Sequence, residues 1–201
     1  FVMPEEDVTL KACSKSRTNE YTVTVEHYLM NTDGTYPDAP HETTQKPCKY
    51  GSELKLTDAA NEYEGFTVNP DKTKEMNPDY TGTVTGDVKL KIYYDRNRYT
   101  VTVEHYYMDT AGNYPDKPSV TEDLKPYYGG ILVHKTLARE IKGLSFNENK
   151  TIQENGNRTQ TEVKGNTTVR LYYDRAVCTV TYDYRTNGGT SADKETVKTY
   201  Y

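Results

Sequence analysis

An eight-residue segment, Tyr-Thr-Val-Thr-Val-Glu-His-Tyr, occurs twice in this chain without a change, at Tyr21–Tyr28 and again 78 positions later at Tyr99–Tyr106. A second segment, Tyr-Tyr-Asp-Arg, occurs at Tyr93–Arg96 and returns after 79 positions at Tyr172–Arg175. The offsets agree within one residue, and a fixed period indicates that the chain repeats a structural unit. Because this period exceeds the roughly 20 to 50 residues of solenoid repeats, we expect each repeat to be a domain with its own core.

The two offsets divide the 201-residue chain into two complete repeats with partial segments at the ends. We expect the first repeat at residues 21–98 and the second at residues 99–176. Residues 1–20 would contain the end strand of a truncated preceding repeat and a linker, and residues 177–201 the start of a truncated following repeat. Only Asp95–Arg98 lies between the last strand of one repeat and the first of the next. Four residues span at most about 14 Å, so we expect neighbouring repeats to abut.

Alternating hydrophobicity predicts the first and last strands of each repeat. In the first strand, Val23, Val25 and His27 alternate with threonine and glutamate, which is the period of a half-buried strand. In the last strand, Leu90 and Ile92 alternate with lysines in the same way. We therefore expect these apolar side chains to form the core.

Between these strands, the spacing of apolar residues predicts one short helix per repeat. In the first repeat the pattern covers Leu56–Tyr63 and is followed by Gly65; in the second it covers Val133–Ile141 and is followed by Gly143. Two polar stretches are predicted to be long loops: Asn69–Asp79 and Asn147–Arg158. Strands around a single helix predict an α+β fold that is rich in strand.

Charge and hydropathy patterning exclude two classes of partner. The chain has 25 Lys and Arg against 30 Asp and Glu, a formal net charge of −5, and its basic residues are scattered. Without a basic stripe to neutralise phosphates, we expect no nucleic acid partner. No run approaches the roughly 18 apolar residues of a membrane-spanning helix, so we expect no membrane insertion.

The three cysteines do not form a repeated framework. Cys48 stands opposite Tyr127 in the other repeat and Cys178 opposite Tyr99, while Cys13 precedes both repeats. Because an odd set at unmatched positions is not typical of shared disulfides, we expect incidental thiols and leave the role of each cysteine open.

The sequence contains one duplicated pair of an acid and an imidazole, at Glu26-His27 and at Glu104-His105. Adjacent residues of a strand point to opposite faces, so neither glutamate can orient its neighbouring histidine. We therefore expect strand packing here, with no catalytic residues, no metal site and no cofactor. The Asn31–Gly34 segment faintly resembles a calcium loop, but its counterpart in the second repeat lacks the aspartate, which favours a simple turn.

Tyrosine is unusually frequent, with 20 residues, and two of them are candidate binding residues. Tyr36 and Tyr114 lie in matching Tyr-Pro-Asp segments, where an aromatic face could stack on a sugar. The alternative is structural, because tyrosines next to proline also hold loops in place. We keep both interpretations, with sugar binding at Tyr36 and Tyr114 as the hypothesis to test.

The two repeats resemble the mucin-binding-protein (MucBP) repeats of Gram-positive surface proteins. The resemblance rests on the Tyr-Thr-Val-Thr-Val opening, the Asp33-Gly34 turn, Gly65–Val68, and Gly82–Asp87 before the Tyr-Tyr-Asp ending. The second repeat departs from the pattern at Thr161–Asn166. The similarity spans about residues 21–175.

The ends of the chain are similar to a different family, the Listeria/Bacteroides or internalin B-type repeat. Phe1–Leu10 resembles the last strand of that repeat, and Val180–Tyr184 with Asn187–Thr190 resembles its first strand and turn. Both resemblances imply ubiquitin-like β-grasp modules in a cell-surface array, and neither implies catalytic residues.

These resemblances imply a non-catalytic repeat region of an extracellular adhesin, a monomer within a longer chain attached to the cell wall through other parts. The partner they imply is host mucin glycoprotein or another glycan. Two alternatives remain open: a structural stalk with no ligand, and a spacer that tethers a catalytic domain lying outside this chain.

Overall fold

A computed structural model describes residues 19–183 and 194–200 of the chain. The described residues form two compact units. The first contains the described residues up to Leu29, then Pro37–Asn61 and Val68–Tyr94. The second contains Met30–Tyr36, Glu62–Thr67 and the described residues from Asp95 onward, so two loops of the first repeat belong to it. The end strand and linker predicted within residues 1–18 lie outside the described residues.

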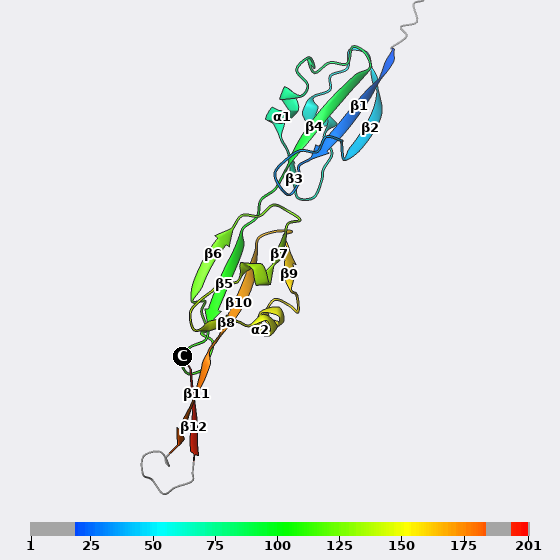
Figure 1. The fold of residues 1–201 in the computed structure, drawn as a ribbon. Coiled ribbons are helices and arrows are strands. Elements are labelled where there is room, and N and C mark those ends of the chain that lie inside the picture. Colours follow the sequence, from blue (N-terminus) through cyan, green and yellow to red (C-terminus); the bar gives the residue numbers. More distant parts are fainter. Residues whose placement is uncertain (1–18, 184–193, 201) are drawn as a thin grey trace, which may run out of the picture. The chain divides into compact units, whose positions relative to one another are not determined.

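The first repeat contains a four-stranded sheet in the order β2-β1-β4-β3 (Figure 1). Its strands are β1 (Glu20–Leu29), β2 (Glu42–Lys49), β3 (Phe66–Val68) and β4 (Val88–Arg96). The central strand β1 pairs antiparallel with β2 and parallel with β4. The first and last strands of the repeat therefore run side by side in the same direction.

The second repeat has the same arrangement, in the order β6-β5-β10-β8. Its strands are β5 (Val101–Tyr107), β6 (Val120–Leu124), β8 (Leu144–Phe146) and β10 (Thr167–Arg175). Again β5 pairs antiparallel with β6 and parallel with β10. A separate two-stranded ladder joins β7 (Ile131–Val133) to β9 (Gln160–Glu162). Both repeats have strands flanked by short helices, which confirms the strand-rich α+β class (Figure 1).

The alternation in the sequence correctly identified the core. Val23, Val25, Leu90 and Ile92 are all at most 2% exposed. His27 shares the face of the two valines and is fully buried with them. The period of two in these strands therefore determines which side chains pack inward.

The predicted positions of the helices were wrong. Leu56–Ala59 and His134–Leu137 form only single 3-10 turns, η1 and η2, and the residue after each, Ala60 or Ala138, has an extended backbone. The α-helices are instead α1 (Pro70–Glu75) and α2 (Glu148–Glu154), inside the stretches predicted to be loops.

Local capping explains where the helices begin. The Asn69 side chain accepts a hydrogen bond of 2.8 Å from the Lys72 backbone N–H, and Pro70 occupies the first helical turn. Asn147 accepts the equivalent bond from Lys150. An asparagine cap satisfies an N–H that has no partner inside the helix, and this matters most in a helix of two turns or fewer. The apolar pattern that begins at Leu56 covers too few residues to form a helix there without a comparable cap.

After the second repeat, β11 (Val177–Asp183) pairs antiparallel with β12 (Lys194–Tyr200). That these strands begin a further repeat stays a prediction, as do the proposed boundaries at residues 20, 98 and 176. Within the described part of the chain, no helix is long and apolar enough to cross a lipid bilayer.

Candidate functional site

The duplicated histidines lie at equivalent places in the two cores and bind equivalent tyrosines. His27 Nδ1 lies 2.8 Å from the Tyr94 hydroxyl, and His105 Nδ1 lies 2.8 Å from the Tyr173 hydroxyl. Each tyrosine hydroxyl also accepts a backbone N–H, from Asn61 in the first repeat and from Arg139 in the second. If the hydroxyl donates its proton to Nδ1, the neutral imidazole carries its own proton on Nε2.

Burial keeps these imidazoles neutral. It lowers the pKa of His27 and of His105, because the charged form loses its hydration in the core. In the second repeat Glu122 opposes this effect, since its carboxylate lies 3.0 Å from His105 Nε2 and favours the protonated form. In the first repeat Nε2 faces the Thr44 hydroxyl at 3.3 Å instead.

The glutamates next to the histidines lie on the other face of their strands, as the alternation predicted. Glu26 accepts hydrogen bonds from Tyr28 at 2.9 Å and from Lys89 at 2.8 Å. Glu104 is held in the same way, by Tyr106 at 2.9 Å. Neither acid is bonded to the adjacent imidazole, so these pairs form no acid and base couple.

Sequence reasoning missed Glu122, the acid that does reach an imidazole. It comes from β6, and only the pairing of β6 with β5 brings it close to His105. The resulting chain of Glu122, His105 and Tyr173 ends on a backbone N–H, and both rings are fully buried. This arrangement stabilises a core and exposes no nucleophile. Among residues 19–183 and 194–200, no cluster of three or more potential metal ligands is present.

The candidate sugar-binding tyrosines have their hydroxyls bound inside their own repeats. Tyr36 donates a hydrogen bond to Asp95, and Tyr114 donates one to Asp174, at the ends of β4 and β10. Both rings are half-buried. Burial and the Asp174 carboxylate raise the pKa of Tyr114, because both disfavour a phenolate. These hydrogen bonds hold each loop in place, and only the exposed part of each ring is left to contact a ligand.

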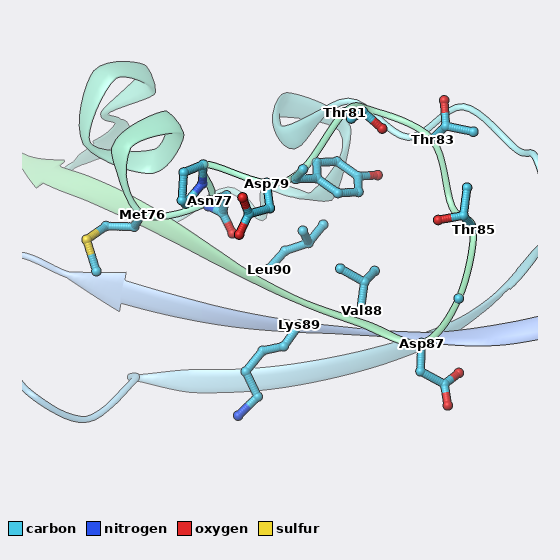
Figure 2. Close-up of a pocket in the computed structure, with 13 residues that line it drawn as sticks. Met76, Asn77, Asp79, Thr81, Thr83, Thr85, Asp87, Val88, Lys89 and Leu90 are labelled. Carbon is cyan, nitrogen blue, oxygen red and sulfur yellow. The ribbon is translucent and has the colours of Figure 1, made fainter.

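A hollow of about 330 Å³ lies in the first repeat under the loop that joins α1 to β4 (Figure 2). Figure 2 shows Val88 and Leu90 projecting into this space, whereas Asp87 and Lys89 project to the other side of the strand. The rest of its lining is mainly polar: Asn77, Asp79, Tyr80, Thr81, Thr83 and Thr85. An apolar floor with a rim of hydroxyls and one carboxylate suits a small polar ligand.

Two of the groups at the hollow are already bound to the protein. The Asp87 carboxylate accepts a hydrogen bond of 2.7 Å from the Thr22 N–H, and the Tyr80 hydroxyl donates one of 2.7 Å to the Leu54 carbonyl. In the corresponding segment of the second repeat, Gln160–Glu162 forms β9 and pairs with β7, whereas in the first repeat Thr83 forms a single antiparallel bridge with Glu53.

Two solved structures of mucus-binding repeats align with the chain at low similarity. The crystal structure of Mub-RV is 11% identical with a TM-score of 0.24, and the alignment covers 76% of this chain and 97% of that one. The type 2 repeat of the mucus binding protein MUB from Lactobacillus reuteri is 8% identical with a TM-score of 0.22, covering 78% and 100%. No family model matches the sequence. No curated protein sequence matches it either.

Proposed function

We propose that the chain is a non-catalytic part of an extracellular bacterial adhesin, in which each repeat is a β-grasp module that adds length to a surface-displayed array. The observation that supports this proposal most strongly is the parallel pairing of the first and last strands in each repeat. Two neighbouring parallel strands begin at one edge of a module and end at the other. A chain built in this way enters a module at one end and leaves at the opposite end.

The register of the strands determines how much length one module adds. Val23 pairs with Val88 and Leu29 with Tyr94, so the chain leaves the first repeat beyond the point where β1 ends. β1 has 10 residues, and at roughly 3.3 Å per residue the entry and exit points lie about 30 Å apart. The second repeat has the equivalent register, from Val101 opposite Thr167 to Tyr107 opposite Tyr173. Such modules suit a role in projecting or presenting a ligand-binding surface.

Host mucin glycoprotein or another glycan is the proposed ligand, and the Tyr36 and Tyr114 loops are the proposed contact. Their hydroxyls are engaged by Asp95 and Asp174, so the exposed part of each ring would supply the contact by stacking on a sugar. Because the two loops are equivalent, a multivalent glycan could bind both and gain avidity.

The test is binding of the whole chain to immobilised mucin and to a glycan array. We expect binding that is abolished when Tyr36→Ala and Tyr114→Ala are combined, and retained when the same two residues become phenylalanine, which keeps the rings. Thermal unfolding of each variant separates lost binding from lost folding. Binding that survives the double alanine substitution would show that these loops are not the contact.

The competing function is a structural stalk with no ligand, or a spacer for a catalytic domain outside this chain. The hydrogen bonds from Tyr36 and Tyr114 to strand-end carboxylates favour it, because they give both tyrosines a structural role without any ligand. Absence of binding to mucin and to every glycan at high micromolar concentration would leave this function in place of adhesion.

A further inference from the structure

The loop that carries Tyr36, residues Met30–Tyr36, belongs to the second compact unit although it lies in the sequence of the first repeat. Two contacts from the end of β4 bind it. Asp95 accepts a hydrogen bond from the Tyr36 hydroxyl, and Arg96 Nε donates one of 2.8 Å to the Met30 carbonyl. The loop is therefore bound near both of its ends by the last two residues of the strand.

Tyr127, a residue of the second repeat, contacts the middle of this loop. A Cβ on Gly34 would fall 2.9 Å from the Tyr127 hydroxyl oxygen, so the glycine and the hydroxyl lie against each other. Arg98 binds the same hydroxyl, with a hydrogen bond of 2.7 Å from Nη2, and its guanidinium lies over the Tyr127 ring at 4.0 Å from the centroid. Because the arginine both bonds and stacks, it fixes the ring beside Gly34.

Tyr128 is connected to the same loop through an arginine. Arg96 Nη1 donates a 2.8 Å hydrogen bond to the Tyr128 carbonyl, while Nε of the same guanidinium is bound to the Met30 carbonyl. The guanidinium also lies over the Phe66 ring, 4.6 Å from the centroid. One side chain thus joins the backbone of the loop to the backbone of Tyr128, and the position of Tyr128 affects where the loop begins.

The Tyr128 ring packs on a second loop of the first repeat, Glu62–Thr67. A Cβ on Gly65 would fall 2.1 Å from the Tyr128 Cγ atom, and the ring meets Phe66 edge-on with centroids 6.3 Å apart. The Tyr128 N–H donates a 2.8 Å hydrogen bond to the Asn97 carbonyl, and the Asn97 N–H donates one of 2.8 Å to the Gly65 carbonyl. All of these residues belong to the second compact unit.

We propose that Tyr127 and Tyr128 are positioning residues for the Tyr36 loop, so that the candidate glycan contact of the first repeat is completed by the second repeat. Tyr127 supports the loop at Gly34, and Tyr128 orients Arg96, which binds the start of the loop. A ring held in one place loses less freedom when a sugar stacks on it. The proposal rests on the proposed function for the role of Tyr36, whereas the positioning itself is measured without a glycan.

Hydrogen exchange at two matched amides of the whole chain tests the proposal. The Asn31 N–H donates a 2.7 Å hydrogen bond to the Thr35 carbonyl within the Tyr36 loop, and the Asp109 N–H donates one of 2.8 Å to the Asn113 carbonyl at the equivalent place in the second repeat. When Tyr127→Ala and Tyr128→Ala are combined, we expect the ratio of the Asn31 rate to the Asp109 rate to rise at least about tenfold. The ratio corrects for a general loss of stability in the second repeat.

Gly65→Ala tests the same coupling from the first repeat, because it displaces the Tyr128 ring and leaves both tyrosines in the chain. It should raise the ratio as well. Gly51→Ala is the matched control, since Gly51 has the same φ of +78° as Gly65 but a Cβ added there would meet no atom within 4 Å, so the ratio should stay unchanged. Tyr128→Phe keeps the ring on Gly65 and should also retain the ratio of the unsubstituted chain.

An unchanged ratio in both the double alanine chain and the Gly65→Ala chain would overturn the proposal, and so would equal increases for Gly65→Ala and Gly51→Ala. Binding to immobilised mucin is measured on the same chains. There the Tyr127→Ala and Tyr128→Ala chain should bind as weakly as a Tyr36→Ala chain. A raised ratio without mucin or glycan binding by the unsubstituted chain would refute the glycan function alone, and glycan binding with an unchanged ratio would refute the positioning role alone.

Discussion

Hydrogen bonds between neighbouring strands explain why a histidine occupies one core position in each repeat. The buried His27 and His105 each bind a tyrosine hydroxyl from the neighbouring parallel strand, and each tyrosine binds a backbone N–H beyond it. Because an imidazole without partners would be costly in a core, these bonds make the histidine tolerable there. The duplication of His27 as His105 is thus explained by packing.

Acid should destabilise both repeats, because each has buried histidines: His27 in the first repeat, and His105 and His134 in the second. Burial lowers the pKa of these three histidines in the folded state, so the unfolded chain binds more protons as the pH falls below the ordinary histidine pKa of about 6.5. Stability is then complete above that pH and declines below it. At His105 the Glu122 carboxylate raises the pKa and the Arg139 charge lowers it, whereas at His27 the Glu42 charge raises the pKa and the His41 charge lowers it.

Thr44→Glu tests this explanation, because Thr44 occupies the place of Glu122. We expect it to make the first repeat less sensitive to acid, as measured by urea unfolding at pH 7.5 and pH 5. Gln45→Glu is the matched control, since it adds the same charge on the exposed face of β2 and should leave the pH dependence unchanged. Equal effects of the two substitutions would show that net charge, and not contact with His27, governs the response.

Removing the hydroxyl of a loop tyrosine should cost stability without a ligand. Tyr114→Phe deletes the hydrogen bond to Asp174 while keeping the ring packed on Tyr172. A bond to a charged acceptor at a half-buried site contributes on the order of 1 kcal/mol, so the urea midpoint should fall by a corresponding amount. An unchanged midpoint would mean that the Tyr114 hydroxyl does not hold this loop in place.

At the scale of elements, the sequence predicted the strands well and the helices poorly. The repeated period of two in β1, β4, β5 and β10 is a long signal that burial reinforces, and the core valines followed from it. The helices have only 6 and 7 residues, too short for a clear apolar period. The asparagine followed by proline at Asn69-Pro70 was the available signal, and the loop assignment overlooked it.

Contacts between residues far apart in the sequence could not be predicted, because they depend on which elements pair. Glu122 reaches His105 only through the register of β6 on β5, and Tyr128 reaches Gly65 across many residues of chain. Single-sequence periodicity describes faces of elements and not which elements meet. The Tyr36 and Tyr114 loops were predictable as a pair because their motif is duplicated, whereas their bonds to Asp95 and Asp174 were not.

The asparagine caps should contribute measurably to helix stability. Asn69→Ala removes the acceptor for the Lys72 N–H and should destabilise the first repeat by about 1 kcal/mol, seen as a lower urea midpoint. Asn69→Asp keeps a capping oxygen and should lose much less. If both variants unfolded at the midpoint of the unsubstituted chain, the cap would not be what positions α1.

At the scale of the whole molecule, the proposed function depends on each repeat connecting opposite ends through parallel strands. Force applied to the ends of such a module must shear β1 past β4, or β5 past β10, and so break many ladder hydrogen bonds together. A module whose terminal strands were antiparallel neighbours would be unzipped one bond at a time. Resistance to pulling is therefore expected from this strand arrangement, and the proposed function requires it.

Single-molecule pulling on the whole chain, held at its two ends, is the decisive experiment for this mechanical role. We predict two abrupt unfolding events of similar length, one per repeat. From Glu20 to Arg96 the first repeat has 96 − 20 + 1 = 77 residues. At roughly 3.6 Å per residue, and after the folded length of about 30 Å is subtracted, each event should lengthen the chain by about 250 Å. Gradual extension at low force, or a single event spanning both repeats, would refute it.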